Sequence, residues 1–142
     1  MIVSVTRRSV AVGLSALLLS ACTTNSGGSR SGLLSSGGSN ASAVYITALQ
    51  GGIVSRSAVE LSSSEKQRAL EAEYRALEAA PGGQPVIWTG RNVSGQVVAS
   101  APYQVGAQNC RQYSHKLNDG GRQTEARGTA CRNANGTWTP LT

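Results

Sequence analysis

The three cysteines are the residues of this 142-residue chain whose surroundings point most directly to chemistry. Cys22 follows Leu19, Ser20 and Ala21 at the end of a short apolar run. An apolar residue, two small residues and a cysteine form the pattern of a bacterial lipobox, in which the thiol receives diacylglycerol before a signal peptidase cleaves in front of it. The pattern predicts that Cys22 is acylated, with palmitate-type chains, and becomes the first residue of a mature lipoprotein.

The segment before Cys22 has the parts of an export signal. Arg7 and Arg8 make its start basic, and residues 10–19 form an apolar run. A run of this length is about half of what a helix needs to cross a ~30 Å hydrocarbon core. We therefore expect residues 1–21 to be a cleaved signal peptide. The residues after Arg8 fit the twin-arginine motif poorly, so the general secretion route is favoured while both routes stay open.

The destination of the exported chain is read from its charge and from the residue after Cys22. Thr23 stands where an aspartate would retain a lipoprotein in the inner membrane, so we expect the outer membrane, facing either the periplasm or the cell surface. Loss of residues 1–21 removes two arginines and no acid, which lowers the formal charge from +6 to +4. A basic surface favours anionic partners. The expected partners are the membrane, through the Cys22 anchor, and an anionic envelope component or an outer-membrane protein; export argues against nucleic acid.

The next segment, residues 22–60, is expected to be a lipidated flexible tether. Residues 23–43 are mainly Ser, Gly, Asn and Thr, which bury too little to offset their ordering entropy. A flexible coil of this length has a reach of roughly 25 Å. Residues 44–54 are an apolar, glycine-containing island too short to span a bilayer. Two interpretations stay open for it: a close helix contact or a segment flat on the bilayer, and a strand or loose segment covering a globular domain.

A globular domain is expected over residues 61–142, beginning with a helix. Ser62 and Glu65 fit a capping box, and Leu70, Tyr74 and Leu77 recur at the spacing of one buried helical stripe. The Pro-Gly-Gly run at 81–83 ends the helix. The charged residues of this helix are interpreted as a solvated surface and not as catalytic carboxylates.

After the helix, short runs with period-two character and Gly, Asn and Pro between them predict strands. The short connections predict an antiparallel meander, and Pro140 predicts an edge position for the last strand. The fold class is therefore α+β, with one amphipathic helix packed on a small sheet of about five strands. The expected strands are 85–89, 96–103, 109–117, 123–131 and 137–141.

The third and fourth of these strands can be placed in register from the sequence. Centring a two-residue turn on Gly120 and Gly121 makes the numbers of facing residues sum to 241. This register predicts a Cys110–Cys131 disulfide, which suits an oxidising compartment and leaves Cys22 as the odd, lipidated cysteine. The register also gives an opposite-charge pair and an aromatic–glycine pair, which are Lys116 with Glu125 and Tyr113 with Gly128.

The same register sorts the two faces of the hairpin. Tyr113, His115 and Leu117 share the face expected under the helix, so His115 is interpreted as a packed or rim side chain and not as a catalytic base. The cysteine side is expected to be wetter, and metal binding has little support because Cys-x-x-Cys spacing is absent. No cofactor is expected. The basic residues after the helix are interpreted as a solvated face or one that meets an anionic envelope component: Arg91, Arg111, Lys116, Arg122, Arg127 and Arg132.

Six short motifs in the C-terminal part are informative through their order and spacing. They are Gly-Gln-Pro-Val-Ile-Trp at 83–88, Ser-Gly-Gln-Val at 94–97, Tyr-Gln at 103–104, Asn-Cys-Arg-Gln-Tyr at 109–113, Gly-Thr-Ala-Cys-Arg at 128–132 and Asn-Gly-Thr-Trp at 135–138. With these motifs and the lipobox, the chain resembles the 17 kDa surface antigen family of alphaproteobacterial outer-membrane lipoproteins. The resemblance implies an envelope location and antigenicity, and no catalytic residues. Many members have a longer glycine-zipper segment, to which only residues 48–54 correspond here.

The sequence leads to one main hypothesis and two alternatives. The main one is a non-enzymatic outer-membrane lipoprotein of the surface-antigen type with a structural or binding role in the envelope. The alternatives are a periplasmic inhibitor of a lysozyme-type hydrolase and an accessory lipoprotein of outer-membrane protein assembly. An enzyme is not expected, because the sequence has no recognisable triad, metal or phosphate-binding constellation.

Overall fold

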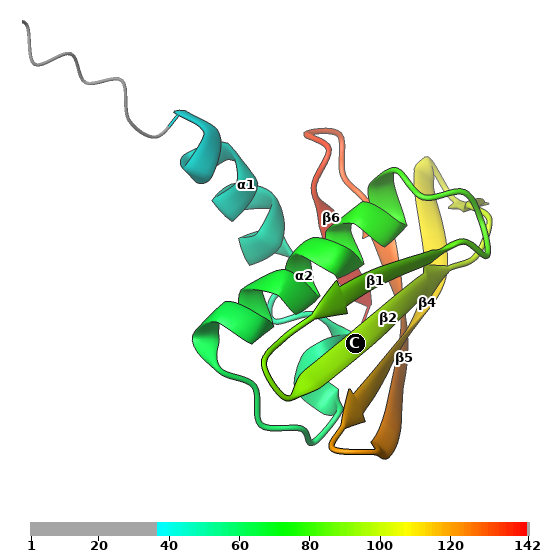
Figure 1. Cartoon of the computed structure of the whole chain (residues 1–142). Helices are drawn as coiled ribbons and strands as arrows, with labels where there is room; N and C mark the ends of the chain where they lie inside the picture. The colour runs from blue at the N-terminus through cyan, green and yellow to red at the C-terminus, as the bar shows by residue number, and fades with distance from the viewer. Residues whose placement is uncertain (1–36, 142) are drawn as a thin grey trace, which may run out of the picture. The chain divides into compact units, whose positions relative to one another are not determined.

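The structure is a computed structural model that describes residues 37–141 (Figure 1). Two α-helices and a short 3-10 helix precede a single antiparallel sheet. The helical elements are α1 (Gly37–Ala48), η1 (Ile53–Arg56) and α2 (Ser63–Glu78). The strands are β1 (Pro85–Thr89), β2 (Val93–Ala99), β3 (Tyr103–Val105), β4 (Gln108–Asp119), β5 (Arg122–Arg132) and β6 (Trp138–Leu141).

The sheet has the meander topology that the short connections predicted. Its strand order is β1-β2-β4-β5-β6, and every pairing is antiparallel. β3 lies off this path and pairs with β4. β6, which contains Pro140, is an edge strand as expected, because a proline cannot donate a hydrogen bond to a further strand.

The expected second strand, 96–103, is wrong in its bounds. The structure starts β2 at Val93 and ends it at Ala99, and Tyr103 begins the separate strand β3. Both strands run along the same side of β4, but the sum of paired residue numbers changes from 212 for β2 to 213 for β3. The break contains Pro102, which has no N–H for a ladder. One apparent strand is therefore two, separated by a shift in register.

The β4–β5 hairpin has the register derived from the sequence. Tyr113 faces Gly128, Lys116 faces Glu125, and Gly120 and Gly121 form the turn with φ values of 55° and 92°. Both strands are longer than expected by one to two residues at each end, which follows from the tight turn. Cys110 faces Cys131, and the two are joined by a disulfide of 2.01 Å.

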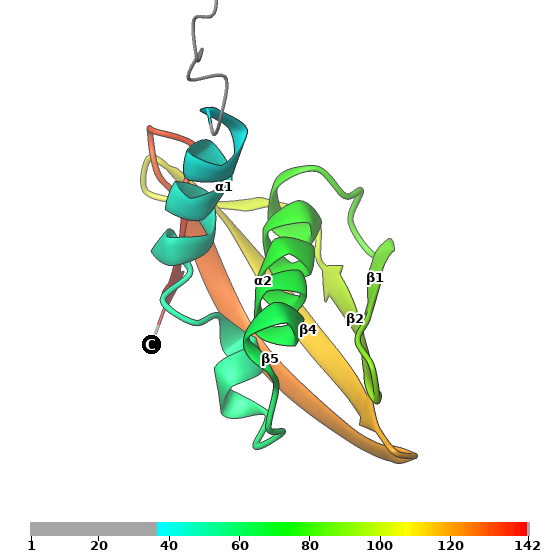
Figure 2. The same cartoon turned by 60° about the vertical axis from the view of Figure 1, so that its left-hand side comes forward.

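Helix α2 covers one face of this sheet (Figures 1 and 2). Its start is the predicted capping box, in which the Ser62 hydroxyl accepts from the Glu65 N–H and the Glu65 carboxylate accepts from the Ser62 N–H. Leu70 and Leu77 are buried, as the stripe predicted. Three buried alanines lie beside them and keep the helix surface flat, which suits close packing on a sheet. These are Ala69, Ala72 and Ala76.

The expectation of a flexible tether over residues 22–60 does not hold for its second part. Residues 37–48 form α1, and Tyr45 on this helix stacks against Tyr74 of α2 with ring centroids 5.0 Å apart. After α1, the chain buries Leu49, Ile53 and Val54 in the core. Residues 44–54 fit parts of both interpretations: the segment covers the domain, though in helical form, and Gly52 makes a close contact with Leu70 and Glu73 of α2. The part of the expected tether before residue 37 lies outside the described residues, as does the signal segment.

No helix within residues 37–141 has the length and apolar character needed to cross a membrane. The core is formed between α2, η1 and the inner face of the sheet. Four strands contribute to it, among others through Trp88 of β1, Val97 of β2, Leu117 of β4 and Trp138 of β6.

Candidate functional site

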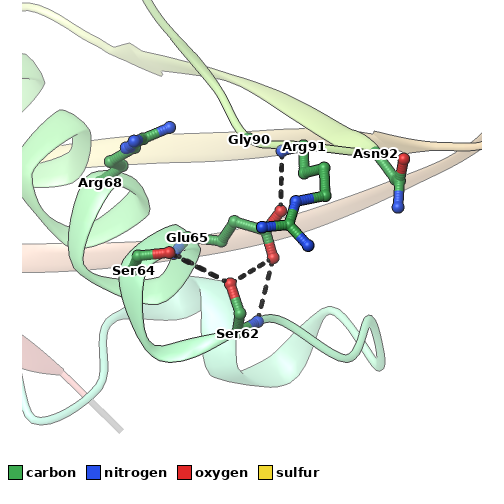
Figure 3. Close-up of a pocket in the computed structure, with 7 residues that line it drawn as sticks. All are labelled: Ser62, Ser64, Glu65, Arg68, Gly90, Arg91 and Asn92. Carbon is green, nitrogen blue, oxygen red and sulfur yellow. Dashed lines mark hydrogen bonds between the residues drawn. The ribbon is translucent and has the colours of Figure 1, made fainter.

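The start of α2 and the β1–β2 turn enclose a surface pocket of about 430 Å³ (Figure 3). The Glu65 carboxylate lies between Ser62 and the turn, and accepts a hydrogen bond of 2.9 Å from the Arg91 N–H. On the far side of the helix turn, Arg68 donates 2.8 Å to the Thr89 carbonyl. The pocket is therefore the place where α2 is joined to the tip of the first hairpin. Its lining also includes Ser64, Gly90 and Asn92.

The electrostatics of this pocket centre on Glu65. The Ser62 hydroxyl donates to the carboxylate at 2.6 Å and, together with the N–H groups of Arg91 and Ser62, lowers the pKa of Glu65 from 4.5 to about 2. A carboxylate held ionised by three donors is a poor general acid or base at neutral pH. Glu65 therefore acts as a helix cap and a joint between two elements.

A second polar cluster lies inside the core. His115 of β4 and Glu73 of α2 are both fully buried and 2.8 Å apart, from Nδ1 to Oε1. Trp88 of β1 donates through Nε1 to His115 Nε2 at 2.8 Å. The N–H groups of Ile53 and Val54 donate to Glu73 Oε2 and Oε1 at 3.1 and 2.9 Å. The cluster joins α2, η1, β1 and β4 through one chain of hydrogen bonds.

The donors around this cluster fix the tautomer of His115. The Trp88 N–H points at Nε2, so Nε2 is the acceptor and carries no proton. Nδ1 therefore carries the proton and donates it to Glu73. A histidine and a carboxylate at this distance resemble the base and the orienting group of a hydrolase. Because both side chains are fully buried and the second imidazole nitrogen is occupied by Trp88, the pair cannot reach a substrate and holds the core together.

Burial also changes the pKa of the neighbouring Tyr113. This side chain is almost completely buried on the same face of β4. Loss of solvation raises the pKa of its phenol, and the negative charge of Glu73 raises it further. Tyr113 is therefore a neutral core residue across the accessible pH range.

Arg111 is the clearest departure from the sequence interpretation of the sheet surface. It was expected on an exposed basic face, but its side chain is buried under the end of α2. The guanidinium donates to the carbonyl oxygens of Ala76, Leu77 and Ala80 at 2.8 to 3.0 Å, and to that of Ser100 at 2.7 Å. Burial lowers its pKa. Arg111 thus satisfies the free carbonyl groups at the C-terminus of the helix, where a positive charge is favourable.

Two more of the expected surface cations are paired. Arg132 forms a two-fold contact with Glu78, both N···O distances being 2.9 Å, and Trp138 also donates to this carboxylate. These donors, the Arg132 guanidinium first, lower the pKa of Glu78. Arg127 pairs with Glu125. Within the described residues, Arg91, Lys116 and Arg122 are the cations of the predicted set that are exposed and have no ion pair.

Of the three cysteines predicted to form covalent bonds, the structure describes two. Cys110 and Cys131 are joined, as predicted. Cys22 lies outside the described residues. Within residues 37–141, no three His, Cys, Asp or Glu side chains come together in a way that would hold a metal ion.

The sequence interpretation missed the burial of two charged residues, Glu73 and Arg111. Only the burial of Glu73 could have been recognised from its position in the sequence. Glu73 was grouped with the solvated charges of the helix, yet it is three residues after Leu70 and four before Leu77, on the buried stripe. A charge at that spacing indicates a buried partner, here His115. Arg111 also falls on the inner face of the hairpin with Tyr113, but the sequence does not reveal that α2 ends over it.

The comparisons with known proteins concern the C-terminal part of the chain. Residues 75–139 match the family described as 17 kDa outer membrane surface antigen. The 17 kDa surface antigen of Rickettsia bellii (strain RML369-C) is 37% identical over 81 residues, covering 55% of this chain and 51% of the relative. That of Rickettsia prowazekii (strain Madrid E) is 36% identical over 78 residues, covering 52% and 49%. That of Rickettsia rickettsii is 33% identical over 81 residues, covering 55% and 51%.

This chain spans about half the length of the curated relatives it matches. The comparison with solved structures found no significant match. The matched region runs from the last turn of α2 into β6, and so contains strands β1 to β5 and the disulfide. Of the buried cluster it contains Trp88 and His115 but not Glu73. The resemblance drawn from the sequence motifs is thereby confirmed: in its C-terminal part, this chain is similar to the 17 kDa surface antigens.

Proposed function

We propose that this chain is a non-enzymatic lipoprotein of the outer membrane, anchored by the lipid on Cys22, whose domain has a structural or binding role in the envelope. The observation that carries the non-enzymatic part is the complete burial of Glu73 and His115, because this pair has the composition of an acid–base dyad but no access to a substrate. The lipobox at 19–22 supports the anchor. The names of the related proteins, which are surface antigens, support a surface location.

The anchor is tested on the mature protein purified from a bacterial host. Intact-mass and N-terminal peptide spectra should show an acylated Cys22 as the first residue, and the protein should fractionate with outer membranes. A Cys22→Ser variant should keep its signal segment or appear unacylated in the soluble fraction. A matched control, Thr23→Asp, keeps the cysteine and should stay acylated but move to the inner membrane. An unacylated wild-type N-terminus would refute the proposal.

An anionic envelope component is the partner that the charges favour. Arg91 in the β1–β2 turn and Arg122 at the β4–β5 turn lie at the same end of the sheet, because Val93 pairs with Asp119. Lys116 is exposed on β4 near this end. Contacts of exposed cations weaken strongly with salt. Binding of lipopolysaccharide to the protein should fall with added NaCl and in an Arg91→Ala/Arg122→Ala variant, but stay unchanged in an Arg75→Ala control on the exposed side of α2.

A further inference from the structure

The β3–β4 hairpin projects from the domain as an arm, which we define as residues 100–109. Every residue of the arm is exposed, and Tyr103 and Val105 expose 41% and 52% of their surface. The segment from 99 to 110 contains no Asp, Glu, Lys or Arg. Water-exposed hairpins normally carry charges, especially at sheet edges, where charges prevent unwanted pairing. An uncharged arm with two exposed apolar side chains is therefore suited to a surface other than water.

The arm lies at the end of the molecule where the chain enters the domain. Gln108 at the base of its turn donates to Asn133 of the β5–β6 loop at 3.4 Å. Gly136 in the same loop lies next to the ring of Tyr45 on α1. Figure 2 shows the first turn of α1, the β5–β6 loop and the yellow β3–β4 hairpin toward the top of the view, whereas in Figure 1 α1 lies at the upper left and the hairpin at the upper right.

Segments next to the arm also carry few charges. Residues 37–48, which form α1, and residues 133–142 contain no Asp, Glu, Lys or Arg. The charged side chains that border α1 belong to α2 and include Glu71 and Arg75, while Arg132 next to the β5–β6 loop is paired with Glu78. The opposite end of the sheet carries Arg91, Asp119 and Arg122 at its two turns. The arm and the β5–β6 loop therefore lie at the end of the sheet whose connecting loops carry no charge.

We propose that the arm is a bilayer contact, with Tyr103 and Val105 inserted among the lipid head groups beside the anchor. This inference rests on the proposed lipidation of Cys22. Residues 23–36 separate that cysteine from α1, and 14 residues span at most about 50 Å even when fully extended, so the start of α1 stays within that distance of the membrane. Tyrosine suits the interface because its ring is apolar and its hydroxyl remains hydrated.

The base of the arm is held in place by the disulfide, which favours insertion. Tyr103 of β3 pairs with Cys110, and Cys110 is bonded to Cys131 on β5. The disulfide therefore fixes the strand from which the arm projects to the centre of the sheet. A rigid arm loses less conformational entropy on insertion than a loose loop of the same composition.

The test uses the mature acylated protein in vesicles of phosphatidylethanolamine and phosphatidylglycerol. An environment-sensitive fluorophore is attached to Ala107→Cys in the arm or, as a reference, to Arg122→Cys at the opposite end. We expect a blue shift and quenching by nitroxide-labelled lipid at position 107 but not at position 122. A Tyr103→Ser/Val105→Ser change should lower the inserted population about tenfold. Ile87→Ser, which removes an exposed apolar side chain of β1, is the matched control and should have no effect.

Three outcomes would overturn the inference. One is equal quenching at positions 107 and 122, and another is insertion that persists in the double serine variant. The third is a blue shift at position 107 that requires no lipid and grows with protein concentration, because a second copy would then cover the arm. If mass spectra show Cys22 without lipid, the proposed function fails, but the arm is still tested by holding the protein on nickel-chelating lipids through an N-terminal histidine tag.

Discussion

At the scale of single residues, the domain is built around one buried carboxylate. Glu73 receives hydrogen bonds from the N–H groups of Ile53 and Val54 and from His115, so all of its partners are donors. Gly52 makes room for it: its φ is +63°, and a Cβ at this position would overlap the Glu73 carboxylate and Leu70. A charged residue on the buried stripe of α2 thus connects η1 to the sheet.

Replacing Glu73 with glutamine should destabilise the domain by about 2 kcal/mol, because the amide NH2 must face at least one N–H group and leaves a buried donor unsatisfied. The measurement is urea unfolding of the Cys22→Ser protein. Glu71→Gln is the matched control on the same helix, where we expect a change within about 0.5 kcal/mol. Equal effects of the two substitutions would show that the buried cluster does not contribute as described.

Glu65 predicts how stability changes in acid. Its pKa is lowered from 4.5 to about 2 in the folded state, chiefly by the Ser62 hydroxyl. The unfolded state therefore binds more protons between these two values, and stability must fall as the pH falls through this window. The urea midpoint should decrease from pH 4.5 toward pH 2, and less steeply for Glu65→Gln than for the wild type. A parallel decrease in both proteins would contradict the role given to Glu65.

At the scale of elements, the disulfide joins the two central strands where two short strands attach. Cys110 also pairs with Tyr103 of β3, and Cys131 pairs with Thr139 of β6. The covalent bond therefore organises one end of the sheet, while the tight turn at Gly120 and Gly121 organises the other. The two ends of the β4–β5 hairpin are held by different means.

Removing the disulfide as Cys110→Ser/Cys131→Ser should cost about 3 kcal/mol, because the closed loop spans a sequence separation of 21. Amide exchange should become faster in β3 and β6 than at the β4–β5 turn. Unfolding with and without a reducing agent checks the assignment: the reductant should destabilise the wild type and leave the double variant unchanged. Uniform acceleration of exchange over the whole sheet would show that the bond does not act locally.

The elements also show what the sequence was able to predict. The meander, the helix cap and the register of β4 and β5 were readable because each depends on local spacing, such as the Gly120–Gly121 turn and the positions of two cysteines. The β2–β3 break and α1 were not, because a shift of one residue in register and a helix of small uncharged residues leave no periodic pattern. The burial of Arg111 depends on where α2 ends in space, and no local pattern contains that information.

At the scale of the whole molecule, the outer strands β1 and β6 are each protected against pairing with a further strand. On β1, the Gly90 N–H donates to the Val93 carbonyl, so the backbone groups of the odd-numbered residues point away from β2. At these positions Pro85 has no N–H to donate. The Thr89 carbonyl already accepts a hydrogen bond from Arg68. On the other edge, β6 contains Pro140. Proline and occupied carbonyl groups are effective barriers to edge-to-edge pairing.

We therefore expect the unacylated Cys22→Ser protein to sediment as a monomer. Opening the β1 edge with Pro85→Val/Arg68→Ala should increase self-association, seen as a concentration-dependent rise in weight-average mass by analytical ultracentrifugation. Pro81→Ala/Arg75→Ala removes the same residue types outside the edge and should remain monomeric. Self-association of the wild type through β1 would refute this account of the edges.

The packing of α1 against α2 has a consequence for how the domain samples the space above a membrane. Because α1 belongs to the domain, the proposed lipid on Cys22 would be connected to the domain through residues 23–36 and not through residues 23–60. Even when fully extended, 14 residues span at most about 50 Å, against about 130 Å for 38 residues. The shorter connection raises the effective concentration of the domain at the bilayer without any new contact.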